Sequence, residues 1–180
     1  MISGPSGAGK GTLVARVREL RQNLGLTVSA TTREPRAGEV DGVSYYFLTK
    51  EEFMRRVDAG QFVEWAEVHG NCYGTLVSEV EQKLASGSSL ILEIDVQGAL
   101  QVRDRIPDAV LIFIKPPSLE ILKERLVGRG TESPETIELR MNNAQHEMEL
   151  ADRYDDIVVN DDLETATAEL MSVFEKHERN

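Results

Sequence analysis

One glycine-rich stretch near the N-terminus decides how the rest of the sequence is interpreted: Gly4-Pro5-Ser6-Gly7-Ala8-Gly9-Lys10-Gly11-Thr12. Gly4, Gly9 and Lys10 fit the pattern G-x-x-x-x-G-K. Glycine at these points lets backbone N–H groups converge on phosphate oxygens with no side chain in the way. The lysine then reaches the β- and γ-phosphates as a mobile positive charge. The stretch therefore predicts a loop that binds a nucleoside triphosphate by its phosphates.

The sequence on both sides of this loop has the context that the motif requires. Residues 1–3 are an apolar strand end, and apolar residues recur at helical spacing from Leu13 to Leu24. We expect this helix to end at Gly25 and to add its dipole and unpaired N–H groups to the phosphate site. Three residues make a very short strand, so either the strand is short or the translation start lies upstream.

The position after the lysine departs from the general motif. Gly11 stands where a serine or threonine hydroxyl usually binds magnesium, and Thr12 follows one residue later. Either Thr12 supplies a hydroxyl, or the magnesium is held mainly through water and substrate oxygens.

Composition narrows the class of protein. The 180 residues are enough for one compact domain. The net charge of -11 lacks the basic footprint of a nucleic-acid binder and disfavours an anionic membrane. Cys72 is the only cysteine, so neither an internal disulfide nor a cysteine-rich metal site is expected. With no apolar run of about 20 residues and no signal-peptide pattern, we expect a cytoplasmic protein.

Beyond the loop, apolar strands alternate with amphipathic helices, which predicts an α/β fold with mostly parallel strands. The region from about 32 to 80 breaks this alternation and is expected to be an insertion. Strands are expected at 26–29, 90–95, 109–114 and 157–159. Helices are expected at 13–24, 49–60, 78–87, 118–128, 134–150 and 162–177, with starts marked by Thr49, Ser78, Ser118 and Pro134.

Several later blocks together resemble guanylate kinases. The run from Ser29 to Glu39 resembles the TTR-x-PR-x-GE signature of that family. Further blocks follow in the family's order, at 62–66, 70–75, 91–98, 125–131 and 159–162. The resemblance implies transfer of the γ-phosphoryl group of ATP, with Mg²⁺, to GMP or dGMP, giving ADP and GDP or dGDP.

The resemblance also implies an architecture. It is a P-loop NTPase-type parallel sheet flanked by helices, with a GMP-binding insertion and a helical lid. A single domain would then have its core at about 1–31, 81–127 and 154–180. The insertion would cover about 32–80 and the lid about 128–150.

On the donor side, the resemblance implies one set of roles for phosphoryl transfer. Positioning and charge stabilisation carry this reaction, so a lysine and arginines suffice without a nucleophile. The implied catalytic residues are Lys10, Arg125, Arg129 and Arg140. ATP would be bound by Gly4, Pro5, Ser6, Gly7, Ala8, Gly9, Lys10, Gly11, Thr12 and Asn160. Magnesium would be held by Thr12, Glu93 and Asp95 through water or substrate.

On the acceptor side, the resemblance implies a second set. GMP would be bound by Ser29, Arg33, Arg36, Tyr45, Glu64, Tyr73, Thr75 and Asp95. Planar guanidinium groups of Arg33 and Arg36 suit bidentate contact with phosphate oxygens. The Glu64 carboxylate can accept hydrogen bonds from both N–H groups on the guanine edge, and Thr75 complements its acceptor edge. Adenine would leave these buried polar groups unpaired.

Two alternatives stay open at this point. Lys10-Gly11-Thr12 also occurs in adenylate-kinase-like loops, although the blocks around Glu64 and Thr75 argue against a different nucleoside monophosphate kinase. A non-enzymatic scaffold module of guanylate-kinase type would usually lack the loop lysine and lid arginines, which this sequence retains.

Overall fold

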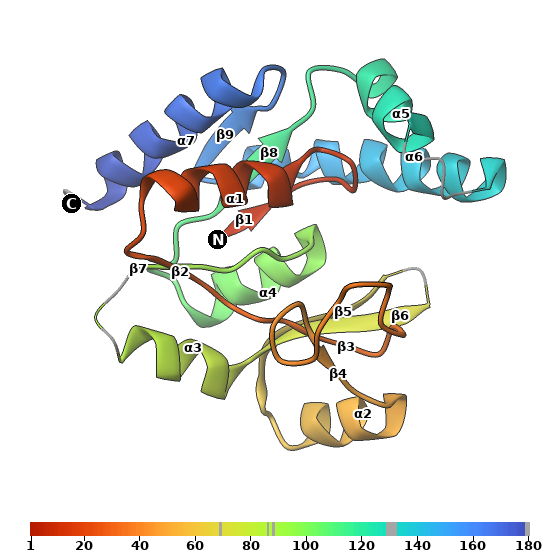
Figure 1. Ribbon diagram of the computed structural model, residues 1–180, viewed down its shortest axis with the longest axis vertical. Helices are drawn as coiled ribbons and strands as arrows, with labels where there is room; N and C mark the ends of the chain where they lie inside the picture. The colour runs from red at the N-terminus through yellow and green to blue at the C-terminus, as the bar shows by residue number, and fades with distance from the viewer. Residues whose placement is uncertain (69, 86, 88, 129–132, 179–180) are drawn as a thin grey trace. The chain divides into compact units, whose positions relative to one another are not determined.

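The computed structural model describes residues 1–68, 70–85, 87, 89–128 and 133–178. They form two compact units: Met1–Gln22 with Val110–Asn180, and Asn23–Ala109 (Figure 1). Within the described residues, no helix has both the length and the apolar character needed to cross a membrane.

The first unit is built on a parallel sheet. Its strand order is β1-β8-β9, with β1 at Ile2–Ser3, β8 at Ile112–Lys115 and β9 at Asp156–Val159. Ile112, Phe113 and Ile114 in the central strand are buried, as a continuous apolar run in a covered parallel strand should be. The helices are α1 (Lys10–Leu20), α5 (Leu119–Gly128), α6 (Pro134–Glu149) and α7 (Leu163–Glu178), with a 3₁₀ turn at Ala151–Arg153. Helices α1 and α7 lie side by side (Figure 1).

The second unit contains two sheets. A parallel pair joins β2 (Leu24–Leu26) to β7 (Ser89–Ile91). A four-stranded mixed sheet has the order β4-β3-β6-β5, with β3 at Ala30–Thr31, β4 at Tyr46–Phe47, β5 at Phe62–Val68 and β6 at Asn71–Leu76. Its helices are α2 (Lys50–Asp58), α3 (Val77–Leu84) and α4 (Val96–Arg105). Phe53 of α2 stacks on Phe62 of β5 at 4.4 Å between ring centroids, and both belong to a core cluster that includes Cys72.

The predicted α/β class with parallel strands is confirmed, and so are three helix starts. Thr49 accepts a hydrogen bond from the Glu52 N–H at 3.1 Å. Ser118 accepts one from the Ile121 N–H at 3.2 Å, and Pro134 occupies the first turn of α6. These starts depend on local chemistry, which the sequence displays directly.

Three predicted boundaries are wrong. The first helix ends at Leu20 and not at Leu24, because Leu24 is buried in β2, where it pairs with Ser89. The strand expected at 26–29 therefore lies two residues earlier. Helix α3 begins at Val77 without a side-chain cap, and the Val77 N–H donates to the Gln61 carbonyl at 2.9 Å. In each case a partner distant in sequence overrides the local pattern.

Candidate active site

The glycine-rich loop in the first unit has a backbone that only glycine fits at two points. Gly4 has φ +142°, and a Cβ there would lie 2.2 Å from the Ile114 carbonyl oxygen of β8. Gly9, which precedes the first residue of α1, has φ +87°, and a Cβ there would lie 2.3 Å from Nδ2 of Asn160. The loop thus passes tightly over the end of β8 and turns directly into a helix N-terminus, where unpaired N–H groups favour an anion.

Lys10 is the first residue of α1, and its ammonium group folds back over the loop. Its Nζ donates to the carbonyl oxygens of Gly4 at 2.5 Å and Pro5 at 3.1 Å. The side chain is thereby placed in the loop that was predicted to bind phosphate.

Elements far apart in the sequence bring two predicted arginines to the same region. Arg140 of α6 donates from Nη1 to Oγ of Ser6 in the loop at 2.7 Å. Arg125 of α5 donates to the backbone carbonyl of Asn160 at 2.9 Å. The Asn160 side chain in turn donates to the Ala8 carbonyl at 2.7 Å.

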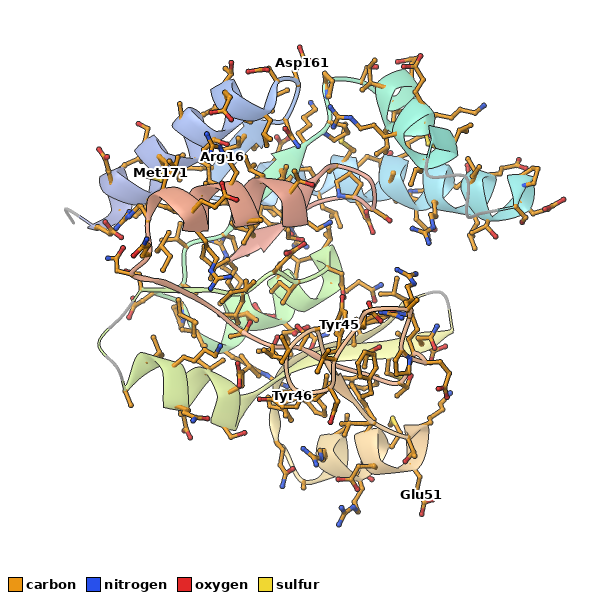
Figure 2. The ribbon with its side chains drawn as sticks, viewed as in Figure 1. Arg16, Tyr45, Tyr46, Glu51, Asp161 and Met171 are labelled. Carbon is orange, nitrogen blue, oxygen red and sulfur yellow. The ribbon has the colours of Figure 1, made fainter. Side chains whose placement is uncertain are left out.

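Asp161 follows Asn160 at the turn between β9 and α7, and its carbonyl lies 3.5 Å from Arg125 Nη2 (Figure 2). The structure therefore assembles Lys10, Arg125 and Arg140 around one loop, a concentration of positive charge in an otherwise acidic protein. Arg129 lies outside the described residues.

The contact between Gly9 and Asn160 gives a stability prediction. We expect Gly9→Ala to lower the free energy of unfolding by about 2–3 kcal/mol, because it adds backbone strain and displaces the Asn160 amide. Gly60→Ala is the matched control, since Gly60 has φ +67° but nothing within 4 Å of a Cβ, so it should cost only about 1 kcal/mol. Urea unfolding of both variants measures the difference, and equal losses would mean that the Asn160 contact is unimportant.

A buried carboxylate in the second unit has a defined partner. Glu64 of β5 is 2% exposed and lies opposite Thr75 of β6, whose hydroxyl donates to Oε1 at 2.7 Å. Gly98 of α4 lies against the other oxygen, since a Cβ there would be 2.2 Å from Oε2. The two residues predicted to read guanine are therefore hydrogen-bonded to each other, and the carboxylate is buried.

Burial raises the pKa of Glu64 to about 7, and the negative charge of Asp95 adds to the rise, while the hydrogen bond from Thr75 opposes it. A raised carboxyl pKa means that the folded protein resists ionisation that the unfolded chain undergoes near pH 4.5. The contribution of protonated Glu64 to the free energy of unfolding is fully present below pH 4.5 and is lost as the pH rises through about 7.

We therefore compare the unfolding free energies of the wild type and Glu64→Gln. Relative to the variant, the wild type should lose about 3 kcal/mol as the pH rises from 4.5 to beyond about 7. Urea unfolding of both proteins at about pH 5 and about pH 8 tests this, because the amide does not titrate. A difference that stays constant with pH would contradict the assignment.

The residues predicted to bind the GMP phosphate form a second group in this unit. The Arg33 guanidinium lies 5.4 Å from the centre of the Tyr45 ring, and that ring meets Tyr73 edge-on at 6.2 Å. Arg33 also forms an ion pair with Glu39 at 2.8 Å, and Glu39 accepts a hydrogen bond from the Arg36 backbone N–H at 2.7 Å.

Sequence reasoning did not assign Glu39 a role, although it closes the TTR-x-PR-x-GE signature. Its bond with Arg33 lowers its pKa, with a smaller contribution from the Arg36 N–H. Arg36 itself is exposed, and the Ser29 carbonyl accepts a hydrogen bond from the Tyr46 N–H at 2.9 Å.

Tyr46 is a second residue that sequence reasoning missed. Tyr45 and Tyr46 are adjacent in the chain (Figure 2), but the Tyr46 hydroxyl donates to the buried Glu79 at 3.0 Å. Glu79 also accepts from the Val28 N–H at 2.9 Å, so this carboxylate joins α3 to the β4 segment. Adjacent side chains of an extended segment point to opposite faces, and this alternation could have indicated that Tyr45 and Tyr46 have different partners.

Of the predicted magnesium residues, Thr12 belongs to the first unit, and Glu93 and Asp95 belong to the second. Within the part of the chain that the structure describes, no three His, Cys, Asp or Glu side chains are placed to hold a metal ion. Thr12 is exposed in the first turn of α1, and Asp95 caps α4 by accepting from the Gly98 N–H at 3.0 Å. This arrangement is compatible with Mg²⁺ that keeps most of its water and binds largely through nucleotide phosphates.

Comparisons with known proteins agree with the sequence blocks. The guanylate kinase family profile matches residues 1–177. A guanylate kinase of Synechococcus sp. (strain CC9311) is 52% identical over 94% of this chain and 90% of its own length. A guanylate kinase of Clostridium perfringens (strain SM101 / Type A) is 50% identical over 96% of this chain and 80% of its own. The crystal structure of guanylate kinase from Anaplasma phagocytophilum superposes with a TM-score of 0.81 at 32% identity, covering 99% of this chain and 85% of that one.

Proposed function

Because the chain belongs to the guanylate kinase family, we propose that it transfers the γ-phosphoryl group of ATP to GMP, and also to dGMP, as an ATP:GMP phosphotransferase. The observation that carries the choice of acceptor is the buried Glu64 carboxylate held by Thr75. The chain retains the loop lysine and the arginines that a non-enzymatic module usually lacks, which favours an active enzyme.

The donor site that we propose is the loop of the first unit. Backbone N–H groups of the loop and the N-terminus of α1 hold the phosphates of ATP. Asn160, whose amide donates to the Ala8 carbonyl of the loop, is proposed to lie near the adenine of ATP. Lys10 exchanges the carbonyls of Gly4 and Pro5 for phosphate oxygens when ATP binds. Arg125, Arg129 and Arg140 then stabilise the charge that spreads over the transferring group.

The acceptor site that we propose is in the second unit. Arg33, Arg36, Tyr45, Tyr73 and Ser29 bind the phosphate of GMP. Glu64 and Thr75 select guanine, because an ionised carboxylate accepts from the base's two N–H donors. Asp95 completes this side of the site. No protein group becomes a nucleophile, since the phosphate of GMP attacks directly once it is positioned.

Magnesium is the cofactor that this family uses with ATP. The residues present fit an ion bound mainly to phosphates, with Thr12, Glu93 and Asp95 acting through water or substrate oxygens. When bound, the ion neutralises phosphate charge and orients the transferring group. A resident metal cage made by the protein alone does not fit the described residues.

The remaining expectations stay predictions. These are the cytoplasmic location, the absence of nucleic-acid and membrane partners, and the division into core, GMP-binding insertion (about 32–80) and lid (about 128–150).

A coupled assay of ADP release tests the proposed function. The protein is given ATP with GMP, dGMP, AMP, CMP or UMP. We expect rapid turnover with GMP and dGMP and slow turnover with the other three. Equal rates with AMP and GMP would refute the selection of guanine by Glu64.

A further inference from the structure

The strand that carries Glu64 is irregular at that residue. In the pairing of β5 with β6, Phe62 lies opposite Leu76 and Glu64 lies opposite Thr75. Two steps along β5 therefore match one step along β6, which makes Val63 the extra residue of a β-bulge. Without the bulge, Glu64 would lie opposite Gly74, and its side chain would turn to the other face of the sheet.

β5 is also an edge strand of its four-stranded sheet, so the side away from β6 has backbone groups without a strand partner. Helix α4 supplies partners for them. Arg105 donates from Nη1 to the Phe62 carbonyl at 3.0 Å and to the Val63 carbonyl at 2.7 Å. Gln101 donates to the Trp65 carbonyl at 2.7 Å and accepts from the Trp65 N–H at 3.3 Å.

The four hydrogen bonds flank Glu64 on both sides. Gly98, Gln101 and Arg105 are three and four residues apart, so they lie along one face of α4. The same face brings the backbone at Gly98 against the Glu64 carboxylate. One helix face therefore holds the backbone before Glu64, the backbone after it and the carboxylate itself.

We propose that Arg105 and Gln101 are positioning residues for guanine selection: they lock the bulge in the register that aims Glu64 at the base. This inference rests on the proposed function, since it concerns how the acceptor base is read. Neither residue touches the substrate in this account, and both act through Glu64. The plain alternative is that they only cover an edge strand and stabilise the fold.

Arg105→Met tests the proposal, because methionine keeps an unbranched apolar side chain and removes the donors. We expect the KM for GMP to rise on the order of tenfold, since small displacements of a binding group cost this much or more. The KM for ATP should stay unchanged, and discrimination between GMP and AMP should fall. Arg105→Lys should recover to within about threefold, because an ammonium group also donates to carbonyls. Arg55→Met, at an exposed arginine of α2, is the matched control and should change none of these values.

Binding is measured independently of turnover by the fluorescence of Trp65, the chain's only tryptophan, during titration with GMP. A wild type that fails to bind or phosphorylate GMP would refute the proposed function. A wild type that does both, with an Arg105→Met variant that matches it, would refute this inference alone.

A double-mutant cycle separates positioning from simple stabilisation. If Arg105 acts through Glu64, adding Arg105→Met to Glu64→Gln should lower kcat/KM for GMP by less than about twofold. The same loss in both backgrounds, or a lower melting temperature with unchanged GMP affinity, would overturn the proposal. Should Arg105→Met fail to fold, Gln101→Met serves in the same cycle, because it removes the bonds on the other side of Glu64.

Discussion

Replacing Lys10 by alanine is expected to lower kcat by at least about a thousandfold while the protein stays folded. The ammonium group donates to the loop carbonyls of Gly4 and Pro5 from a partly buried position, and we expect the fold to survive its removal. The transferring phosphoryl group, in contrast, loses a positive charge that stabilises its transition state. Steady-state kinetics with ATP and GMP measure the effect, and circular dichroism verifies the fold.

The control for this variant is Lys50→Ala, which removes an exposed lysine at the start of α2. It should leave kcat within about twofold of the wild type, as surface substitutions usually do. If Lys10→Ala kept kcat within about tenfold of the wild type, the loss would be far smaller than that expected for a transition-state contact. The role assigned to Lys10 would then be wrong.

Replacing Glu64 by glutamine is expected to lower kcat/KM for GMP about 10²–10³-fold, because a carboxylate that accepts two hydrogen bonds is lost. The amide offers one acceptor and one donor group, and its donor would face a donor of guanine. The ratio of GMP to AMP turnover should fall with it, whereas the KM for ATP should change little. The Thr75 hydroxyl can still donate to the amide oxygen, so the pocket should stay intact.

Glu67→Gln is the matched control, since Glu67 is on the same strand but exposed. The same chemical change there should leave the kinetics with GMP unaltered. If both variants behaved alike, the loss would come from the strand as a whole and the base-reading role of Glu64 would fall. Because ionisation of the buried Glu64 destabilises the wild type as the pH rises, we expect Glu64→Gln to gain stability relative to the wild type toward neutral pH. We expect the same variant to be less selective for GMP, and such a loss of function with a gain in stability is common at binding sites.

The parts of the fold that the sequence predicted correctly depend on local chemistry. Thr49 and Pro134 mark helix starts by hydrogen bonding and by ring geometry within a few residues. The end of α1 at Leu20 was missed, because Leu24 gains more from pairing in β2 than from one more helical turn. That pairing joins residues more than sixty positions apart, which no local pattern reveals.

The same division holds for the candidate site. The glycine-rich loop was readable, because its spacing is local and its backbone demands are specific. The contact of Arg140 with Ser6 and the bond of Asn160 to Ala8 span most of the chain, so only the structure displays them. The bulge at Val63 and its partners on α4 were likewise invisible, since the β-pairing and the helix face had to be known first.

The central claim is that the γ-phosphoryl group of ATP ends on GMP, and phosphorus NMR of the complete reaction tests it most directly. The protein is incubated with ATP, GMP and Mg²⁺, and the nucleotide and phosphate signals are followed together. The account predicts that ADP and GDP accumulate in equal amounts without inorganic phosphate. Release of inorganic phosphate without formation of GDP would contradict it.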